Sequence, residues 1–292
     1  MRINEALERF IVQLQADGRS QHTIRQYERH VRLFAHWARD VGHCGLQIER
    51  LDHEGVAAFL ASPLANTRAG GGQKLATSAN CMRSSIRGFL RFCREAGYCH
   101  SDPGRMIRRA RCSPPPPRAL SEDDQRRLLA TLARARDPEG RRDFALFDLM
   151  LKTGIRVGSA VGLCVDDVDL GRGELRIRSA KGNQPVVVLL GTAIRRHMEQ
   201  YLKTRHSGPL FPGRHGHPMT TRHVQRRLSM WAKRAGIKPA ISPHRLRHSF
   251  ATALYQKTGD ILLVREALRH RSIGSTLAYA HGDAARLRKA LA

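Results

Sequence analysis

One stretch in the C-terminal half decides the fold, and it reads Ser242-Pro243-His244-Arg245-Leu246-Arg247-His248-Ser249. His244 and Arg247 are three residues apart, so on a helix both side chains lie on one face. This pair alone is a weak indicator, because most histidines are structural and arginine is common in this chain. The pair gains weight from His270, 23 residues after Arg247, and from Tyr279, nine residues after that histidine.

Two shorter motifs precede this stretch. Thr153-Gly154-Ile155-Arg156 follows an apolar helical pattern, and Gly154 allows a sharp turn that presents Arg156 from a fixed helix end. Ala180-Lys181-Gly182-Asn183 lies between two short β patterns, which places Lys181 on a turn. The candidate site residues are therefore Arg156, Lys181, His244, Arg247, His270 and Tyr279.

These six residues have the chemistry of phosphodiester cleavage. Five are cationic or can become so, and the sixth is a phenol that can act as a nucleophile. Cleavage without a metal needs positive groups around a pentavalent phosphorus, and two guanidinium groups can hold the two non-bridging oxygens of one phosphate. None of the six belongs to a carboxylate cluster, so we expect neither a metal nor another cofactor.

The order and spacing of these motifs resemble the tyrosine recombinase (phage integrase) family. The resemblance covers the whole chain and is strongest from Leu120 onward. It implies a mostly α fold with a small antiparallel β-sheet, in which an N-terminal helical core-binding domain precedes an α+β catalytic domain. It also implies a site-specific recombinase that cleaves and rejoins DNA through a 3′-phosphotyrosyl intermediate, without metal or ATP.

The resemblance also implies a role for each candidate. Arg156 and Arg247 stabilise the transition state, and Lys181 protonates the leaving 5′ hydroxyl. His244 removes the tyrosine proton or donates to a phosphate oxygen, His270 hydrogen-bonds the scissile phosphate, and Tyr279 is the nucleophile.

Two neighbouring residues qualify this assignment. Tyr255 is a rival tyrosine, but it lies on the same helical pattern as Arg247, and we expect it to pack in a core. Ser159 occupies a position where the family commonly has an acid, three residues after the first arginine. Without this acid the pocket is more positive, and we expect weaker activity than in an acid-bearing relative.

The charge balance indicates a polyanionic partner. The chain has 51 basic and 25 acidic residues, for a formal net charge of +26, and both halves are basic. We expect double-stranded DNA as the partner, bound with an affinity that falls steeply with salt. In the long helix expected over about 73–96, four arginines form either phosphate contacts or a solvated face: Arg83, Arg87, Arg91 and Arg94.

The chain divides at a proline run. We expect a helical DNA-clamping domain over 1–112, a semi-rigid linker over 113–118 that contains four consecutive prolines, and the catalytic domain over 119–292. Three short strands are predicted in the second domain, over 165–169, 174–178 and 185–189.

Several compartments are excluded. No apolar run reaches the length of a membrane span, and the N-terminus lacks a secretory signal. The six cysteines include no CxxC pair and are expected to be reduced thiols, so we expect a cytoplasmic location.

Strand exchange between two duplexes needs four cleavages, so we expect a homotetramer on DNA, with an accessory protein or partner recombinase as a further option. The sequence leaves integration, excision, transposition and Xer-type dimer resolution open. Two other functions also stay open, namely a DNA-binding architectural protein without catalysis and a DNA-relaxing enzyme like type IB topoisomerases.

Overall fold

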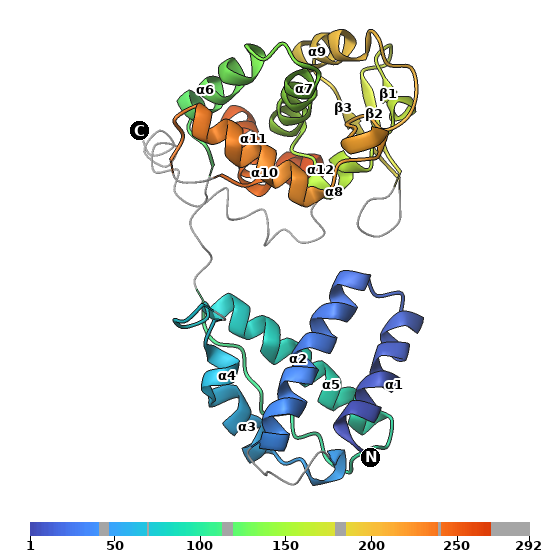
Figure 1. The fold of residues 1–292 in the computed structure, drawn as a ribbon, viewed down its shortest axis with the longest axis vertical. Helices are drawn as coiled ribbons and strands as arrows, with labels where there is room; N and C mark the ends of the chain where they lie inside the picture. Colours follow the sequence, from blue (N-terminus) through green and yellow to red (C-terminus); the bar gives the residue numbers. More distant parts are fainter. Residues whose placement is uncertain (41–46, 69, 113–118, 179–184, 239–240, 270–292) are drawn as a thin grey trace. The chain divides into compact units, whose positions relative to one another are not determined.

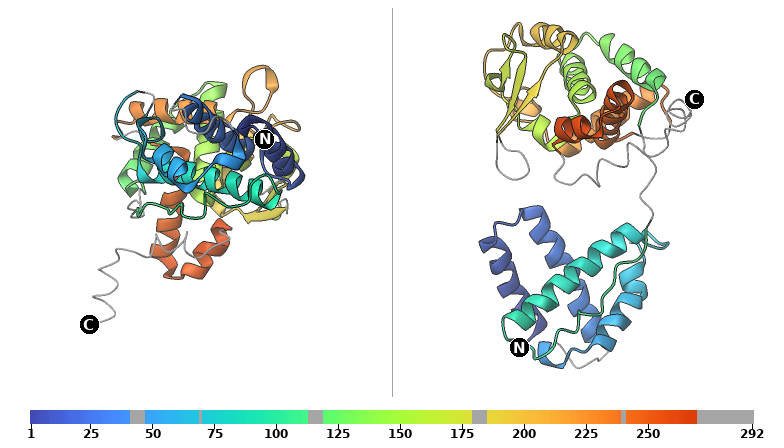
Figure 2. Two further views of the ribbon diagram at one scale, coloured as in Figure 1. Left: turned by 90° about the horizontal axis from the view of Figure 1, so that it is seen from below. Right: turned by 180° about the vertical axis from the view of Figure 1, so that it is seen from behind.

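The computed structural model describes residues 1–40, 47–68, 70–112, 119–178, 185–238 and 241–269. The chain forms two compact units, Met1–Ser113 and Pro114–Ala292, and each has its own hydrophobic core (Figures 1 and 2). None of the described helices is both long enough and apolar enough to cross a membrane.

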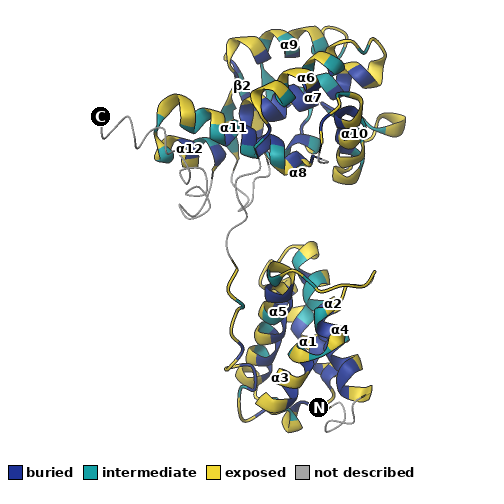
Figure 3. Cartoon of the chain, turned by 90° about the vertical axis from the view of Figure 1, so that its left-hand side faces the viewer, coloured by how far each residue is buried: buried dark blue, intermediate teal, exposed yellow. Residues whose placement is uncertain are grey.

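The first unit is a bundle of helices whose apolar residues recur at helical spacing and meet in one core. Aromatic rings fill its centre, with the Phe34 and Phe59 centroids 5.0 Å apart and those of Phe10 and Phe89 5.7 Å apart. Figure 3 shows the buried residues on the inner sides of the helices. The elements are α1 (Ile3–Ala16), α2 (Gln21–Asp40), η1 (Ile48–Arg50), α3 (His53–Ala61), α4 (Pro63–Asn66) and α5 (Ala76–Glu95).

The start of α5 differs from the prediction. We expected the helix from about Gln73, but Thr67 and Gln73 form an antiparallel bridge, and the Lys74 backbone N–H donates to the carbonyl of Asn66 at 2.6 Å. This backbone pairing closes a hairpin that delays the helix until Ala76. Leu75, which lies within the range predicted to be helical, is the N-cap residue and is 63% exposed.

The second unit is organised around α7 (Pro138–Thr153), most of which is buried. Asp137 caps its first turn by accepting the Gly140 N–H at 2.8 Å, and Pro138 suits the first helical position because that N–H has no partner within a helix. Helix α7 packs against α6 (Glu122–Ala133), α9 (Thr192–Leu202) and α11 (Pro243–Thr258) (Figure 1). The remaining elements outside the sheet are α8 (Val157–Val161), η2 (Val165–Asp167), η3 (Arg214–Gly216), α10 (Thr221–Arg234) and α12 (Ile261–Leu268).

A small antiparallel sheet lies in the order β1 (Val168–Asp169), β2 (Glu174–Ile177), β3 (Val186–Leu189). The first strand is much shorter than predicted, because residues 165–167 form the 3-10 turn η2. Asp167 fixes this turn by accepting the Cys164 backbone N–H at 2.8 Å. The predicted fold class, mostly α with a small antiparallel sheet, is confirmed.

Gly154, at the C-terminal end of α7, offers a direct test of this packing. It has φ +63°, and an added Cβ would lie 2.3 Å from the Phe250 ring of α11. We predict that Gly154→Ala lowers the free energy of unfolding by at least about 2 kcal/mol, since a left-handed alanine is strained and the ring must also move. Urea unfolding measures the loss.

The matched control is Gly158→Ala in α8. Gly158 lies in a helix, and its added Cβ would meet nothing within 4 Å. This change should be neutral or slightly stabilising. Equal effects of the two substitutions would contradict the packing described for Gly154.

Candidate active site

The buried guanidinium of Arg247 joins three segments of the second unit. Arg247 lies in α11 and is 7% exposed. Its Nη1 donates to the Gly154 carbonyl at 2.5 Å, and its Nη2 donates to the Leu268 carbonyl at 2.6 Å. One side chain therefore fixes α11 against the ends of α7 and α12, and the two bonds set the plane of its fork.

Arg156 follows directly from the same turn. Helix α7 ends because Gly154 takes the left-handed conformation, with its N–H donating to the Met150 carbonyl. Ile155 is buried, and Arg156 is the half-buried N-cap residue of α8. The Gly154 carbonyl held by Arg247 is two residues before Arg156, so the structure brings these two predicted arginines to one turn of the chain.

His244 lies in the first turn of α11, directly after Pro243, and is exposed. It is one helical turn before Arg247, as the sequence spacing predicted. His244 and Arg247 thus lie on neighbouring turns of α11, where the histidine is exposed to solvent and the arginine is buried.

His248 is a neighbour that sequence reasoning did not include. It is half-buried in α11, one turn after His244. Burial lowers the pKa of His248, and the positive charges of His244 and Arg247 lower it further. The i, i+4 spacing from His244 was the available signal. His248 favours the neutral imidazole within an otherwise cationic group.

The remaining candidates have different outcomes. Lys181, His270 and Tyr279 lie outside the described residues. Tyr255 packs with Ala251, Val264 and Leu268 in a small cluster between α11 and α12, as expected for a packing residue. In the described part of the chain, no group of three His, Cys, Asp or Glu side chains could hold a metal ion.

Ser159, at the position where the resemblance implies an acid, is half-buried in α8, one turn after Arg156. Its side chain therefore belongs to the short helix that Arg156 caps. The expected effect of this replacement on activity stays a prediction.

A buried ion network fixes α10 on α7. Asp143 is fully buried, and its Oδ1 accepts from Arg142 Nε at 3.0 Å and Nη2 at 2.7 Å. Its Oδ2 accepts from Arg227 Nε at 2.5 Å and from the Trp231 indole at 2.8 Å. Arg227 and Trp231 both belong to α10. Four donors on one carboxylate offset the cost of burying its charge and hold α10 in a fixed rotation.

That rotation exposes a cationic surface at the start of α10. Arg222 and Arg226 are exposed one turn apart, and neither forms an ion pair with a described residue. They line a cavity of about 880 Å³ together with the loop that precedes the helix, and this loop adds Arg214, His215 and His217. Sequence reasoning missed this surface, although the i, i+4 arginine spacing was visible.

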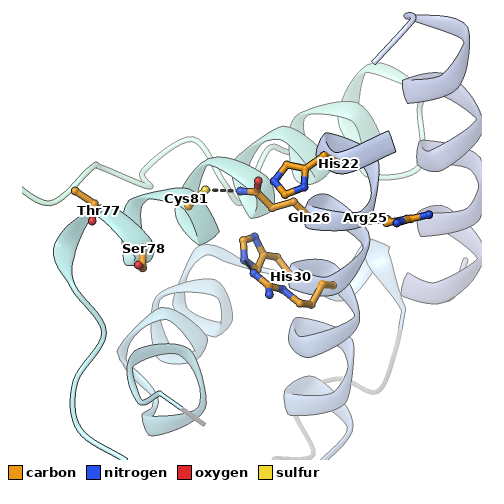
Figure 4. A pocket seen from close by; sticks show the side chains of 8 residues that line it. His22, Arg25, Gln26, His30, Thr77, Ser78 and Cys81 are labelled. Carbon is orange, nitrogen blue, oxygen red and sulfur yellow. Dashed lines mark hydrogen bonds between the residues drawn. The ribbon is translucent and has the colours of Figure 1, made fainter. Parts of the chain in front are cut away.

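A second cationic cavity, of about 480 Å³, lies between α2 and α5 in the first unit (Figure 4). From α2 it is lined by His22, Arg25, Gln26, Arg29 and His30, and from α5 by Thr77, Ser78 and Cys81. Sequence reasoning had considered only arginines of α5.

The four arginines predicted to contact DNA lie further along α5 than this cavity. Arg83 is half-buried, and Arg87, Arg91 and Arg94 are exposed. Arg91 forms an ion pair with Glu95, in which Arg91 Nε lies 3.6 Å from Glu95 Oε1. Their contact with DNA stays a prediction.

His30 closes the floor of the cavity between α2 and α5. It is 5% exposed, and its Nδ1 lies 2.9 Å from the Ser85 hydroxyl. Burial lowers the pKa of His30 to about 4, and the charges of Arg29 and Lys74 add to this effect. The cavity therefore has a neutral imidazole at its base and cationic groups at its rim.

The structure thus has cationic surfaces in both units, and in the second unit Arg247 is bonded to the turn that precedes Arg156. Comparison with known proteins identifies the class of protein. The phage integrase family matches residues 118–286, and the phage integrase N-terminal SAM-like domain matches residues 7–97. The chain therefore belongs to the phage integrase family of tyrosine recombinases.

Whole-length relatives agree with this assignment. The chain is 32% identical to tyrosine recombinase XerC of Chromobacterium violaceum, over 98% of this chain and 93% of that protein. It is 31% identical to tyrosine recombinase XerD of Pseudomonas aeruginosa, over 92% of this chain and 90% of that protein. The protein is a site-specific DNA recombinase, and neither a non-catalytic architectural protein nor a DNA-relaxing enzyme is favoured.

Solved structures show the same fold at lower identity. XerH recombinase bound to palindromic difH substrate, in a post-cleavage complex, has a TM-score of 0.75 and 22% identity, over 98% of this chain and 83% of that chain. The Tn1549 transposon integrase, in complex with a circular intermediate DNA, has a TM-score of 0.75 and 16% identity over the full length of both chains.

The pKa of His30 leads to a prediction about pH. The folded state keeps the imidazole neutral down to about pH 4, whereas the unfolded chain binds a proton below about pH 6.5. The stabilisation is therefore complete above pH 6.5 and is lost as the pH falls towards 4, by at most about 3 kcal/mol. Hydrogen exchange of the α2 and α5 amides at several pH values measures it.

The substitution His30→Gln removes this titration while keeping a side chain that can bond Ser85. The first unit of the variant should lose less stability than wild type between pH 6.5 and 4. A pH dependence that is the same in both proteins would show that His30 does not cause it.

Proposed function

We propose that the protein cleaves each DNA strand with Tyr279 and rejoins it to a partner duplex, as a recombinase of the Xer type. The observation that carries this proposal is the anchored Arg247 fork beside the Arg156 turn. A guanidinium held at two carbonyls needs no reorganisation when charge develops on a phosphate, and such preorganised donors contribute strongly to catalysis.

The proposed reaction is one exchange at phosphorus. The Tyr279 oxygen bonds to phosphorus as the bond to the 5′ oxygen breaks, which leaves a 3′-phosphotyrosyl link and a 5′ hydroxyl. Lys181 supplies the proton that the 5′ oxygen needs, and His244 takes the phenol proton or donates to a phosphate oxygen. Because the link keeps the energy of the broken bond, a 5′ hydroxyl of the partner duplex can reverse the step without metal or ATP.

The other three groups of the proposed site contact the scissile phosphate itself. Arg156 and Arg247 hold the non-bridging oxygens, and His270 hydrogen-bonds the same phosphate. Removing one such donor costs on the order of 3 kcal/mol of transition-state stabilisation.

We also propose which surfaces contact the DNA backbone. The formal net charge of +26 provides long-range attraction. Arg222 and Arg226 are exposed at the positive end of α10, which favours phosphate. The cavity between α2 and α5 offers further cationic groups in the first unit. Together with Arg83, Arg87, Arg91 and Arg94, these groups give each unit a means of gripping a duplex.

The Xer type is supported by relatives that match along almost the whole chain. Exchange of both strands between two duplexes needs four nucleophiles, so the proposal includes a tetramer on two DNA duplexes, either of this chain alone or with a partner recombinase. The proposal also includes a cytoplasmic location, which is supported by the proposed DNA substrate.

A nicked suicide substrate tests the chemistry directly. The nick lets the short strand diffuse away after cleavage, so the protein–DNA link accumulates. We predict a covalent product with wild type and none above background with Tyr279→Phe, because the phenol oxygen is the atom that bonds to phosphorus. Denaturing gel electrophoresis measures the product.

Tyr255→Phe is the matched control, because Tyr255 packs within the same unit and should keep the reaction. If Tyr279→Phe still gave the covalent product, or if only Tyr255→Phe removed it, Tyr279 would not be the nucleophile.

The salt dependence of DNA binding tests the proposed surface on α10. Each of Arg222→Ala and Arg226→Ala should reduce the slope of log affinity against log salt by about 0.9, since each removes one phosphate contact. Arg126→Ala serves as a control because Arg126 is exposed but pairs with Asp123 at 3.6 Å. Unchanged slopes for both α10 variants would rule out these contacts.

A further inference from the structure

We propose that Arg178 is a positioning residue for the acid Lys181, and that it acts through an ion pair with the buried Asp167. This inference rests on the proposed role of Lys181 in protonating the leaving group. Arg178 itself is not assigned any contact with the reacting atoms.

Arg178 is the first residue after the last paired position of β2. Ile177 pairs with Val186 of β3, and the chain beyond Ile177 leaves the sheet. The Arg178 Nε donates to Asp167 Oδ1 at 2.5 Å. The side chain of Asp167 is 2% exposed, and that of Arg178 is 62% exposed.

The acid of this pair is also held by a backbone hydrogen bond that does not involve Arg178. Asp167 Oδ2 accepts the Cys164 backbone N–H at 2.8 Å, and this bond holds the carboxylate in the 3-10 turn η2. A buried carboxylate needs a charged partner, and Arg178 is the residue that ion-pairs with it in the described part of the chain. The bond to Asp167 and its negative charge also raise the pKa of Arg178. An exposed side chain is thereby tied to a fixed point.

This fixed point belongs to the segment that carries the first catalytic arginine. Asp167 follows α8, and Arg156 is the N-cap residue of α8. Lys181 is only three residues beyond Arg178 in the sequence. The ion pair therefore restrains the start of the connection that bears Lys181 relative to the segment that bears Arg156.

The restraint on the chain before Lys181 affects the transfer of one proton, from Lys181 to the leaving 5′ oxygen. As the tyrosine oxygen bonds to phosphorus and the bond to the 5′ oxygen breaks, the Lys181 ammonium gives its proton to that oxygen and becomes a neutral amine. Protonation by a placed acid contributes roughly 100- to 10,000-fold, and a misplacement of about 1 Å costs up to about 100-fold. Loss of the anchor should thus slow only the reaction that needs this proton.

The test compares two substrates that differ in one atom of the leaving group. One nicked DNA has the ordinary 5′ oxygen at the scissile phosphate, and the other has a bridging 5′ sulfur. A thiolate is a far better leaving group, because thiols ionise near pH 8.5, and it departs without a proton. The rate of covalent product formation is measured with each DNA for wild type, Arg178→Met, Arg176→Met and Lys181→Ala.

Arg176 is a close match for Arg178. It lies two residues earlier on β2, so it faces the same side of the strand, and it is also exposed. It forms no ion pair with any residue in the described ranges. The methionine keeps the length of the aliphatic stem in both variants, and each variant loses one positive charge.

We expect Arg178→Met to cleave the oxygen substrate about 10- to 100-fold more slowly than wild type and the sulfur substrate at the wild-type rate. Arg176→Met should match wild type on both. Lys181→Ala should lose the oxygen reaction and recover the sulfur reaction. Arg178→Lys, which keeps a charge for Asp167, should recover part of the oxygen rate.

Three results would overturn the inference. Equal slowing of both substrates by Arg178→Met would show that Arg178 does not act through proton donation. Weaker DNA binding with a smaller salt slope would make it a phosphate contact instead. If Lys181→Ala showed no selective recovery with sulfur, the proposed role of Lys181 would itself fail, and with it the reason for the anchor.

Discussion

The bonds from the buried Arg247 guanidinium to two backbone carbonyls are the constraint on which the rest of the site depends. They join α11 to the end of α7 at Gly154 and to the end of α12 at Leu268. A buried charge is stable only when its donors are satisfied, so the folding of these three segments also places the Arg247 guanidinium, which is proposed to be catalytic. The conformational freedom of the arginine is lost during folding and need not be lost again when DNA binds.

Helix α7 extends this constraint across the second unit. At its beginning, Asp143 binds Arg227 and Trp231 and so sets the rotation of α10, the helix proposed to contact DNA. At its end, Gly154 turns the chain so that Arg156 caps α8. The surface proposed to contact DNA and the turn that bears Arg156 are thus both attached to one buried helix, which keeps their separation fixed within this unit.

Some boundaries of these elements could be predicted from the sequence, because they depend on residues close together in the chain. Gly154 marked a helix end because its backbone requirement is local. The start of α5 and the length of the first strand were missed for the opposite reason. They depend on the pairing of Thr67 with Gln73 and on the carboxylate of Asp167, and these contacts exist only after the chain folds.

In the candidate site, too, features set by local sequence could be predicted and features set by tertiary contacts could not. Spacing alone placed His244 and Arg247 on one helix, and the motif order indicated Arg156 as their partner. Spacing did not reveal that Arg247 is an internal anchor, since this requires knowing which carbonyls α11 meets. It also did not single out Arg222 and Arg226 among many arginines, because their exposure follows from the rotation of α10 that Asp143 imposes.

A crystal structure of the protein with cleaved DNA and vanadate would show the arrangement of the site during the reaction, because vanadate takes the pentavalent geometry of the phosphorus. We expect a vanadium centre with the Tyr279 oxygen at one apical position and with Arg156 and Arg247 both donating to its equatorial oxygens. A vanadium centre with a different apical side chain, or one that Arg247 does not reach, would contradict this expectation.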